Sequence, residues 1–436
     1  MSAASRSELL TKIRHKEALI GIIGLGYVGL PLAVEFARNG FEVTGFDVDD
    51  TKNKQINEGH SHIPDVPDAD LCAVLKAGKL RATSEMSRMG RMDVLDIAVP
   101  TPLRKTKDPD LSYVVRAVES VAATLRRGQL IILESTTYPG TTDEVVQPML
   151  EEKGLRVESD FFLAFSPERV DPGNAQFTTR SIPKVVGGIG PASTEVAAAL
   201  YGSVVAQVVP VTSTRVAEMV KLLENTFRAV NIGLVNEIAL MAHKMDINVW
   251  EVIDAAKTKP FGFMPFYPGP GLGGHCIPID PFYLSWKARQ SGFECRFIEL
   301  AGQVNGSMPE YVVQRITDAL NSVRKPINGS RVHLFGVAYK RDVNDIRESP
   351  ALDILELLLR RGAVVSYTDP YVEKLNHSGY SSHSVAFDAA VSDSYDCAVV
   401  ATDHSAFDYG RIAKLPLVVD TRNAVNASGT STIFRL

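Results

Sequence analysis

The stretch ALIGIIGLGYVG, residues 18–29, joins a short apolar run to a glycine-rich turn. The apolar run predicts a buried strand, and the helical pattern that starts at Val28 ends at an Asn-Gly pair, which is typical of a helix C-terminus. Between them, Gly24, Gly26 and Gly29 form the pattern G-x-G-x-x-G. Such glycines permit a tight turn and bring the backbone and the helix N-terminus close to a pyrophosphate. The stretch therefore predicts a strand, a turn and a helix that bind a dinucleotide.

A carboxylate at the end of the next predicted strand narrows the choice of cofactor. Asp47 closes the strand FEVTGFD and lies 47 − 24 = 23 residues after Gly24. A carboxylate at this place binds the ribose hydroxyls of NAD and repels the additional phosphate of NADP. The alternative is that the glycines serve only the packing of the turn. We predict NAD as the cofactor, with a site made of Gly24, Gly26, Tyr27, Val28, Gly29 and Asp47.

Alternating strands and helices continue beyond this first unit. We expect strands at residues 94–99, 130–133 and 162–165, and helices at 113–125 and 142–152. Such alternation is typical of a parallel, doubly wound sheet.

The middle of the chain differs in character. Residues 213–256 contain no proline, one glycine and a dense apolar pattern of 3.6-residue period, which predicts a long helix, continuous or broken, between two lobes. A loop rich in proline and glycine follows at 260–281, and from residue 331 the alternation of strands and helices returns. We predict an α/β fold with two Rossmann-like doubly wound domains joined by a central helical region, with domains at 1–210, 211–322 and 323–436.

Composition excludes several classes of protein. The 436 residues are 45% hydrophobic and 22% charged, close to the average for globular proteins, and the net charge of -5 argues against a polybasic nucleic-acid surface. No apolar run approaches the roughly 18 residues of a membrane span, and the N-terminus has no signal-peptide pattern. We therefore expect a cytoplasmic protein with neither nucleic acid nor membrane as partner.

Histidine and cysteine spacing argues against a metal site. The four cysteines are widely and irregularly spaced, which fits neither a zinc site nor a disulfide scaffold. His60 and His62 form an H-x-H pair without the carboxylates or cysteines that would complete a ligand set. We predict no metal. One of the four cysteines is then a candidate for a role in catalysis.

Two short segments follow the ends of predicted strands, where ligands lie in open α/β sheets. The first is Val99-Pro100-Thr101-Pro102 and the second is Glu134-Ser135-Thr136-Thr137. Pro100, Thr101 and Thr136 are candidates for the nicotinamide side of the cofactor. The alternative is that they are ordinary turn residues.

A second group of residues suggests covalent catalysis. Lys221 and Asn225 are four residues apart on one helix face, and Cys276 and Asp280 lie in the Gly/Pro-rich loop. A thiolate is a good nucleophile toward an aldehyde, and a lysine ammonium would lower its pKa and stabilise an oxyanion. The alternatives are that Lys221 pairs with Glu218 on a solvated face and that Cys276 is a packed hydrophobe.

Aromatic residues gather before this cysteine. They have two interpretations, loop packing or a wall for a uracil ring and a sugar, and they are Phe261, Phe263, Phe266 and Tyr267. The cysteine lies beside Gly273-Gly274, and these glycines leave backbone room for a substrate carbon.

Three segments together resemble the UDP-glucose/GDP-mannose dehydrogenase family over essentially the whole chain. They read GLGYVGLPLA near the start, VKLLENTFRAVNIGLVNE with GPGLGGHCIPIDPFYL in the middle, and GVAYKRDVNDIRESP in the third domain. Within the family the chain is most similar to the UDP-N-acetylglucosamine 6-dehydrogenase branch, since His275 precedes the cysteine where UDP-glucose enzymes usually carry serine.

The resemblance implies a four-electron oxidation of the C6 hydroxymethyl group of a UDP-sugar to a carboxylate with two NAD+, an activity of nucleotide-sugar metabolism and polysaccharide biosynthesis. It assigns NAD binding to the first domain, dimerisation and the catalytic loop to the central region, and UDP-sugar binding to the third domain. The implied partners are a UDP-sugar substrate and a second copy of the chain in a homodimer.

The resemblance also implies roles for single residues. Cys276 would trap the C6 aldehyde as a thiohemiacetal, a second hydride transfer would give a thioester, and water would release the acid. Lys221 would stabilise oxyanions or assist proton transfer, and Asn225 would hold substrate. Asp280, with Thr136 and an ordered water, would supply the general base.

Further positions match the family outside this group. Glu168, in the stretch S-P-E, is a candidate for hydrolysis and, with Arg169, for substrate contact. In the third domain Lys340 and Arg422 match substrate-binding residues, and Arg347 matches an arginine near the cofactor phosphates. Without the resemblance, these three would be interpreted as solvated surface charges.

Two departures limit the transfer of roles. After Arg169 the chain reads Val170-Asp171-Pro172-Gly173, where the UDP-glucose pattern has an apolar pair and then Arg-Glu, so Asp171 is only a candidate substitute for that glutamate. Pro260 stands where some relatives place an arginine that reaches substrate across a dimer.

Other functions stay open at this point. One is oxidation of UDP-glucose or another UDP-hexose by the same chemistry. Another is a catalytically silent protein that senses NAD or a nucleotide sugar. A two-electron hydroxyacid dehydrogenase is a third, although that chemistry needs no nucleophilic cysteine.

Overall fold

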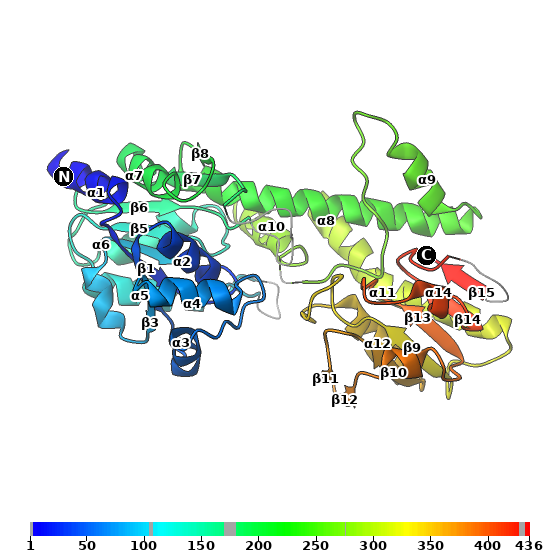
Figure 1. Cartoon of the computed structure of the whole chain (residues 1–436). Helices are drawn as coiled ribbons and strands as arrows, with labels where there is room; N and C mark the ends of the chain where they lie inside the picture. The colour runs from blue at the N-terminus through cyan, green and yellow to red at the C-terminus, as the bar shows by residue number, and fades with distance from the viewer. Residues whose placement is uncertain (1–2, 104–107, 170–179, 275, 427–431) are drawn as a thin grey trace. The chain divides into compact units, whose positions relative to one another are not determined.

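The computed structural model describes residues 3–103, 108–169, 180–274, 276–426 and 432–436 (Figure 1). The chain divides into two compact units. The first comprises Met1–Glu224 and Trp286–Ser291, and the second comprises Asn225–Ser285 and Gly292–Leu436. Two helices, α8 (Thr214–Lys244) and α10 (Asp280–Gln290), contribute residues to both units.

The first unit contains an eight-stranded sheet with the order β3-β2-β1-β4-β5-β6-β7-β8. Its strands are β1 (Leu19–Ile23), β2 (Glu42–Phe46), β3 (Leu80–Thr83), β4 (Val94–Ile97), β5 (Leu130–Leu133), β6 (Phe162–Phe165), β7 (Lys184–Gly188) and β8 (Val208–Pro210). Its helices are α1 (Ala3–Arg14), α2 (Gly29–Arg38), α3 (Asp50–Asn57), α4 (Asp68–Lys76), a 3₁₀ helix (Met86–Arg91), α5 (Ser112–Thr124), a π-helical turn (Thr142–Val146), α6 (Gln147–Glu151) and α7 (Pro191–Tyr201).

Side chains of alternate residues on the strands divide the core of this unit into two layers. On β5, Leu130 and Ile132 pack with residues of α1, α2 and α7 on one face of the sheet. Ile131 and Leu133 pack with residues of α5 on the other face. Helices therefore cover both faces, which confirms the predicted doubly wound architecture.

One strand pair departs from the predicted parallel sheet. Strands β1 to β6 pair in parallel, but β7 pairs antiparallel with β6. A parallel pair needs a crossover connection, usually a helix, and the described residues between β6 and β7 contain no helix. The sequence pattern also missed α1, β3, β7 and β8, which are short or polar.

The second unit contains a five-stranded, all-parallel sheet with the order β10-β9-β13-β14-β15 and a β11-β12 hairpin. Its strands are β9 (Arg331–Phe335), β10 (Val364–Thr368), β11 (Lys374–His377), β12 (Tyr380–His383), β13 (Cys397–Val400), β14 (Leu417–Asp420) and β15 (Thr432–Arg435). Its helices, besides parts of α8 and α10, are α9 (Val249–Ala256), α11 (Arg296–Ser322), α12 (Pro350–Arg360), α13 (Phe387–Ala390) and α14 (Tyr409–Ile412).

This second sheet is also covered on both faces. Val332 and Leu334 of β9 pack with α11 and α12. Phe335 of β9 packs with α13 and α14 on the opposite face. Two Rossmann-like sheets are therefore present, and the predicted boundaries at 210 and 322 remain predictions.

The long helix predicted over residues 213–256 is broken. Helix α8 ends at Lys244, and α9 begins at Val249. Asp246 between them has a backbone φ of 56°, in the left-handed region that ends a helix. Asn248 then caps α9, because its side chain accepts a hydrogen bond from the backbone N–H of Trp250.

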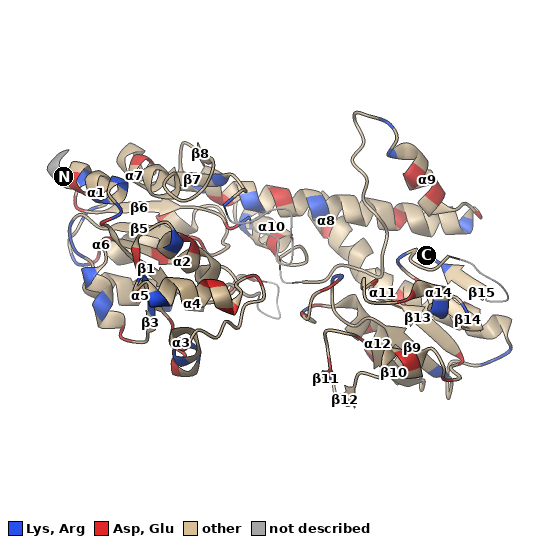
Figure 2. Ribbon diagram, in the orientation of Figure 1, with Lys and Arg blue, Asp and Glu red and all other residues tan. Residues whose placement is uncertain are grey.

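Charged residues of both signs are interspersed over the helices and loops, and the strands carry few of them (Figure 2). In the part of the chain that is described, no helix combines the length and the apolar character needed to cross a membrane.

Candidate active site

The glycine-rich loop between β1 and α2 has the shape that the sequence predicts. Gly24 has a φ of 92°, and a Cβ there would lie 2.6 Å from the carbonyl oxygen of Ala98. At Gly29 a Cβ would lie 1.8 Å from the carbonyl oxygen of Gly24, so no side chain fits at this position. A Cβ at Gly26 would instead meet no atom within 4 Å. The loop thus leaves open space beside Gly26, where the backbone can approach a ligand.

Asp47 lies beside this loop and is held by three groups. Its Oδ2 accepts hydrogen bonds from the backbone N–H of Leu25 at 3.0 Å and from Nζ of Lys52 at 2.9 Å, and its Oδ1 accepts one from the N–H of Asp49 at 3.1 Å. Burial alone would raise the pKa of Asp47. The hydrogen bonds and the Lys52 charge outweigh burial, so the pKa lies below its ordinary value. Asp47 is therefore ionised, as ribose binding requires.

These features fit a dinucleotide. Helix α2 begins without a side-chain cap at Val28. The N–H of Leu30 already donates to the carbonyl oxygen of Gly26 at 3.1 Å, and Pro31 has no N–H, so the backbone N–H groups that could face a pyrophosphate are those of the turn before Leu30. The space beside Gly26 and the ionised Asp47 match the pyrophosphate and the ribose. Lys52 was missed by the sequence analysis, because helix α3 has a polar sequence that offers no signal for a binding residue. Tyr27 and Val28 lie in the same loop.

The segments after β4 and β5 are joined by Ser135. Its Oγ accepts a hydrogen bond from the N–H of Val99 at 2.9 Å and donates one to the carbonyl oxygen of Ile97 at 3.2 Å. Pro100 and Thr101 follow directly, as the sequence predicts, at the carboxyl edge of the sheet. Their contact with the cofactor remains a prediction.

Lys221 and Thr136 form a direct contact in the first unit. Nζ of Lys221 donates a hydrogen bond to Oγ1 of Thr136 at 2.6 Å. The solvated pairing of Lys221 with Glu218 is wrong, because Glu218 is buried and accepts hydrogen bonds from Gly140 at 2.6 Å and Thr142 at 2.9 Å. Glu218 thereby fastens helix α8 to the loop that carries Thr136. Trp286 lies beside the same loop.

The aromatic rings of Trp286 and Tyr138 pack together at the loop that carries Thr136. The ring of Trp286 lies 4.9 Å from the ring of Tyr138, measured between centroids, and Nζ of Lys287 lies 5.1 Å from the Tyr138 centroid. These residues of α10 belong to the first unit. The loop from 134 to 142 is therefore packed on one side and bonded to α8 through Glu218 and Lys221.

Glu168 and Arg169 follow β6 and have different surroundings. The Glu168 carboxylate lies 3.5 Å from Nζ of Lys184, and the side chain is 11% exposed. The Arg169 guanidinium binds both carboxylate oxygens of Glu224, at 2.6 and 3.2 Å, and the carbonyl oxygen of Pro183. A substrate contact by Arg169 stays a prediction.

In the second unit, Cys276, Asp280 and Asn225 are connected. The backbone N–H of Asp280 donates to the carbonyl oxygen of Cys276 at 2.8 Å, so both residues belong to the turn that starts α10. The side-chain amide of Asn225 donates to Oδ2 of Asp280 at 2.6 Å. Asp280 and Asn225 are buried, and Cys276 is half-buried. Asp280 therefore belongs to the same turn as Cys276, and its carboxylate is held by the Asn225 amide.

The glycines before Cys276 allow two loops of the second unit to touch. The N–H of Gly274 donates to the carbonyl oxygen of Arg347 at 3.0 Å, and the φ of Gly274 is 80°. A Cβ at Gly273 would lie 2.5 Å from Cβ of Tyr339. Gly273 thus serves backbone packing against the segment that carries Lys340, and its contact with substrate stays a prediction.

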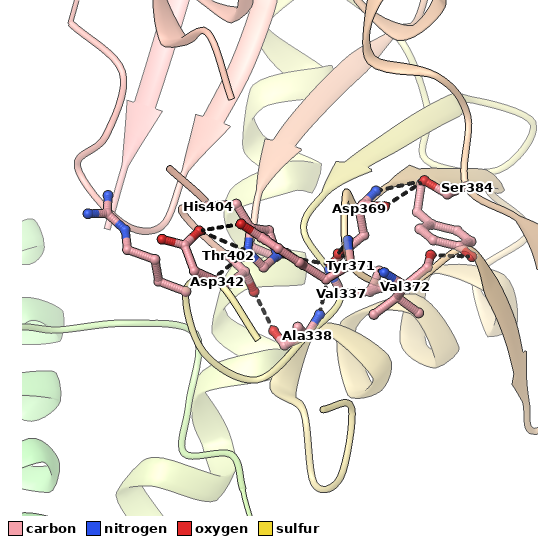
Figure 3. Close-up of polar contacts among 12 residues, drawn as sticks. Val337, Ala338, Asp342, Asp369, Tyr371, Val372, Ser384, Thr402 and His404 are labelled. Atoms are coloured by element: carbon pink, nitrogen blue, oxygen red, sulfur yellow. Dashed lines mark hydrogen bonds and ion pairs between the residues drawn. The ribbon is translucent and has the colours of Figure 1, made fainter. Parts of the chain in front are cut away.

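That segment, residues 336–349, is fixed by a buried hydrogen-bond network (Figure 3). Oδ2 of Asp369 accepts from the N–H groups of Val337 at 2.7 Å and Ala338 at 3.1 Å and from Nε2 of His404 at 3.0 Å. Nδ1 of His404 accepts from the N–H of Asp342 at 2.9 Å. Since Nδ1 accepts, Nε2 carries the proton and the imidazole is neutral. The network holds the segment from both ends of the Lys340 turn.

Arg347 and Arg422 are held differently. The Arg347 guanidinium forms an ion pair with Asp345 at 2.5 Å on the same segment. Arg422 follows β14, and its Nε donates to the carbonyl oxygen of Ala401 at 3.0 Å. Burial lowers the pKa of the Arg422 guanidinium from its ordinary value, so a bound anion would be favourable there.

A pocket of about 320 Å³ lies beside Arg422 in the second unit. The ring of Tyr267 stacks on that of Trp250, with centroids 6.3 Å apart and planes 14° apart, and both line the pocket. The pocket sits at the carboxyl edge of β13 and β14, and it is lined by Trp250, Asp254, Tyr267, Pro268, Asp403, Arg422 and Asn423. Phe266 instead packs edge-on against Phe227, with centroids 5.7 Å apart. An aromatic stack beside an arginine suits a base and a phosphate.

Two sequence hypotheses fall outside the described residues, namely those on His275 and Asp171. Among the residues that are described, no three histidine, cysteine or acidic side chains are grouped so as to hold a metal ion.

Comparison with known proteins gives consistent matches. Models of the UDP-glucose/GDP-mannose dehydrogenase family match residues 18–205 (NAD binding domain), 215–307 (central domain) and 333–427 (UDP binding domain). The chain is 37% identical to UDP-N-acetyl-D-mannosamine dehydrogenase of Pyrococcus horikoshii, over 95% of this chain and 98% of that one. It is 36% identical to UDP-N-acetyl-D-glucosamine 6-dehydrogenase of Pseudomonas aeruginosa, over 90% and 92%. A solved structure of the Pyrococcus horikoshii UDP-D-ManNAc dehydrogenase superposes with a TM-score of 0.87 at 36% identity, over 96% of this chain and 98% of that one.

Proposed function

Because this chain belongs to the UDP-glucose/GDP-mannose dehydrogenase family of NAD-dependent UDP-sugar dehydrogenases, we propose that it oxidises C6 of a UDP-N-acetylhexosamine to the carboxylate. The proposed substrate is UDP-N-acetylglucosamine. The observation that carries the proposal is the arrangement of Cys276, Asp280 and Asn225, in which a cysteine on a glycine-flanked turn is backed by a buried carboxylate and an amide.

Cys276 is the proposed nucleophile. Bound NAD+ would accept one hydride from C6 in each of the two oxidations. After the first, the Cys276 thiolate adds to the aldehyde carbon and forms a thiohemiacetal, and loss of the second hydride leaves a thioester. Water then adds to the thioester carbon, the C–S bond breaks with its electron pair returning to sulfur, and the acid is released.

Proton transfer falls to the polar groups described above. The Lys221 ammonium, fixed by Thr136, stabilises the oxyanion at C6. Asp280, oriented by Asn225, accepts the proton of the C6 hydroxyl in the first oxidation. Glu168 accepts the proton of the attacking water in the hydrolysis of the thioester.

Recognition of the UDP group is assigned to the second unit. The pocket beside Arg422 offers a cation for phosphate and the Tyr267 ring for the base or the sugar. Lys340, on the segment fixed by Asp369, supplies a second cation. Arg347 is assigned to contact the cofactor phosphates, and Phe266 is assigned to pack beside the sugar.

The cysteine mechanism is tested with Cys276→Ala. The variant should form no sugar acid, which wild-type protein should produce with two NADH per molecule, while its NAD affinity should equal that of wild type. Acid is measured by chromatography and NADH by absorbance at saturating substrate. Unchanged acid production in Cys276→Ala would contradict the mechanism.

A substrate panel tests the sugar. The rate of NADH release is compared for UDP-N-acetylglucosamine, UDP-N-acetylmannosamine, UDP-N-acetylgalactosamine and UDP-glucose. The highest kcat/KM should belong to UDP-N-acetylglucosamine. A higher value for another sugar would transfer the same chemistry to that substrate, and binding of both ligands without turnover would revive the silent sensor.

A homodimer through helix α8 is part of the proposal. Phe227, Leu234 and Met241 recur at seven-residue intervals, share one helix face and are exposed, and Phe297 and Leu300 of α11 are exposed as well. A second copy would bury these side chains. Leu234→Glu should then shift the protein from dimer to monomer in sedimentation, whereas Lys244→Glu should not.

A further inference from the structure

A group of ionisable side chains lies buried in the first unit, at the carboxylate of Glu168. We call it the buried cluster, and it consists of Asp96, Glu134, Glu168, Lys184 and Tyr201. Its members come from β4, the end of β5, the segment after β6, the start of β7 and the end of α7. Four of them are almost fully buried, and Glu168 is the most exposed member. The cluster is therefore accessible to water mainly through Glu168.

Lys184 is the only cation of this cluster. Its ammonium forms an ion pair with Glu134 and lies 3.5 Å from Oε2 of Glu168. It also lies 5.2 Å from the centroid of the Tyr201 ring. One ammonium thus contacts both Glu168, the most exposed carboxylate of the cluster, and the fully buried Glu134, which is itself hydrogen-bonded to Glu168.

A count of protons shows that the cluster holds an extra one. The Tyr201 hydroxyl oxygen lies 2.9 Å from Oδ2 of Asp96 and 2.9 Å from Oε2 of Glu134. The hydroxyl has a single proton to donate, so a hydrogen bond to the other carboxyl requires that this carboxyl brings its own. Asp96 and Glu134 then share one proton. Burial raises the pKa of Asp96 to about 6 and that of Glu134 well above its ordinary value, in agreement with this count.

The arrangement costs free energy, which argues for a role beyond stability. Replacing buried ion pairs by apolar side chains of similar volume is often neutral or stabilising, so three carboxyls and one ammonium removed from water are poor evidence of a purely structural role. A sheet of this kind does not need them for its fold. Apolar residues could not provide a cation 3.5 Å from the Glu168 carboxylate. This cation, Lys184, is held in place by its ion pair with the buried Glu134.

We propose that Lys184 is a positioning residue that keeps Glu168 ionised and fixed within the first unit for its role in thioester hydrolysis, and that Asp96, Tyr201 and Glu134 hold Lys184 in place. The inference rests on the proposed function of Glu168. The attacking water gives its proton to the Glu168 carboxylate while its oxygen bonds to the thioester carbon. With one proton already shared by Asp96 and Glu134, that transfer takes the cluster from one net negative charge to neutrality.

The test variant is Lys184→Met. Its kcat for acid formation should fall roughly 10- to 100-fold, which is less than or equal to the roughly 10²- to 10⁴-fold that a general base contributes, because Glu168 itself is retained. The sugar thioester should accumulate on Cys276 and be seen as added mass on the intact protein, while the first NADH formed in a single turnover appears at the wild-type rate. The acidic limb of the kcat profile should move to higher pH, because Glu168 loses the charge of Lys184 and still faces Glu134.

Matched variants separate positioning from general damage. Lys184→Arg should restore most of kcat, since it retains the positive charge. Lys12→Met removes another lysine paired with a buried aspartate, Asp93 at 3.1 Å, and should leave kcat and its pH profile unchanged. If Lys184→Met does not fold, the double variant Lys184→Met/Glu134→Gln removes both charges of the pair and is measured in its place.

The outcomes distinguish this inference from the proposed function. Glu168→Gln should accumulate the same thioester. If Glu168→Gln does so while Lys184→Met, or the double variant, shows wild-type mass and pH profile, the positioning role of Lys184 is overturned and the function stands. If Glu168→Gln forms acid at the wild-type rate, the proposed role of Glu168 itself fails, and with it the inference.

Discussion

Asp47 in the first unit and Asp369 in the second occupy equivalent places in two similar sheets, but they have different partners. Each follows the second strand, and each accepts a hydrogen bond from the loop after the first strand. The backbone N–H of Gly24 bonds to the carbonyl of Phe46, and that of Gly336 bonds to the carbonyl of Thr368, both at 2.8 Å. The two loops read GLGY and GVAY.

The partners of the two carboxylates differ in number and kind. Asp47 accepts three hydrogen bonds, one of them from the side chain of Lys52. Asp369 accepts five, from four backbone N–H groups and His404 (Figure 3). A carboxylate has about four lone-pair sites, so Asp369 has no capacity left for a ribose. In addition, Ala338 occupies the place of Gly26.

Two sheets of similar topology thus place a carboxylate at the same position but give it different hydrogen-bond partners. In the first unit Asp47 accepts three hydrogen bonds and keeps capacity for a fourth, as its proposed contact with the cofactor requires. In the second unit Asp369 is fully used in fixing the loop, and the proposed substrate contact falls to a side chain that the loop carries, Lys340.

The largest expected effect comes from Asp369→Ala. The substitution leaves the N–H groups of Val337 and Ala338 and the buried His404 without their acceptor, so the free energy of unfolding should fall by about 3–5 kcal/mol. Asp47→Ala should lower it by about 1 kcal/mol. Urea denaturation measures both. Equal losses in the two variants would remove the distinction between anchor and ligand.

For NAD affinity the order of the two positions should be reversed, with a larger effect at Asp47 than at Asp369. Asp47→Ala should weaken NAD binding roughly 10- to 100-fold, which is about 1.4–2.8 kcal/mol, because a charge-assisted hydrogen bond to the ribose is lost. Calorimetric titration with NAD measures this, with Asp369→Asn as the control that should retain wild-type affinity. A loss of NAD affinity in Asp369→Asn would place the cofactor at the second loop.

The two units should respond to acid with opposite signs. Burial lowers the pKa of His333 on β9 to about 4, so its contribution to stability is present above the unfolded value near 6.5 and is lost as the pH falls toward 4. Between pH 7.5 and 5 that loss is about 2 kcal/mol for the second unit. His333→Gln, which can keep hydrogen bonds to Ser366 and Thr368, should not show it.

Glu218 should act the other way in the first unit. Burial raises its pKa to about 7, so its contribution to stability is full below the unfolded value near 4.5 and is lost as the pH rises through 7. Acidification from pH 7.5 to 5 should therefore add about 2 kcal/mol more in wild type than in Glu218→Gln, in which only the other buried carboxyls of the unit, Asp96 and Glu134, still contribute. Hydrogen exchange of peptides from β5 and β9, corrected for intrinsic rates, reports the two units separately. Parallel changes in both would contradict the assignment.

The smallest effect on stability is expected for Gly26→Ala. The added methyl group would meet no atom within 4 Å, so the free energy of unfolding should change by less than about 0.5 kcal/mol. NAD affinity should nevertheless fall, because the methyl enters the space left for the pyrophosphate. A melting curve and an NAD titration of the same sample check both statements, and unchanged affinity would mean that the ligand does not approach Gly26.

Local patterns in the sequence predicted the first loop well. Gly24, Gly26, Gly29 and Asp47 lie within one strand, turn, helix and strand, so their spacing fixes their geometry. The two sheets and the long helix follow from apolar periodicity in the same way. The apolar pattern did not decide whether this helix is continuous or broken, because the break depends on one residue, Asp246, in a left-handed conformation.

Contacts between distant residues were not predictable. His404 lies 35 residues after Asp369, and nothing in the pattern GVAY indicates that the two meet. Lys184 opens a strand that the sequence analysis missed, and its partner Glu134 is 50 residues away. Residues whose role depends on a tertiary contact leave no periodic signal, so the anchor of the second loop and the buried cluster emerged only from the structure.

The stacked Trp250 and Tyr267 have a practical consequence. The chain has two tryptophans, and the other, Trp286, lies against Tyr138 in the first unit. Each unit therefore has its own tryptophan, which can be excited selectively over tyrosine, one beside the Arg422 pocket and one beside the Thr136 loop. With Trp286→Phe the emission reports on the pocket alone, and with Trp250→Phe it reports on the loop alone, so nucleotide and cofactor titrations can be separated optically without an attached dye.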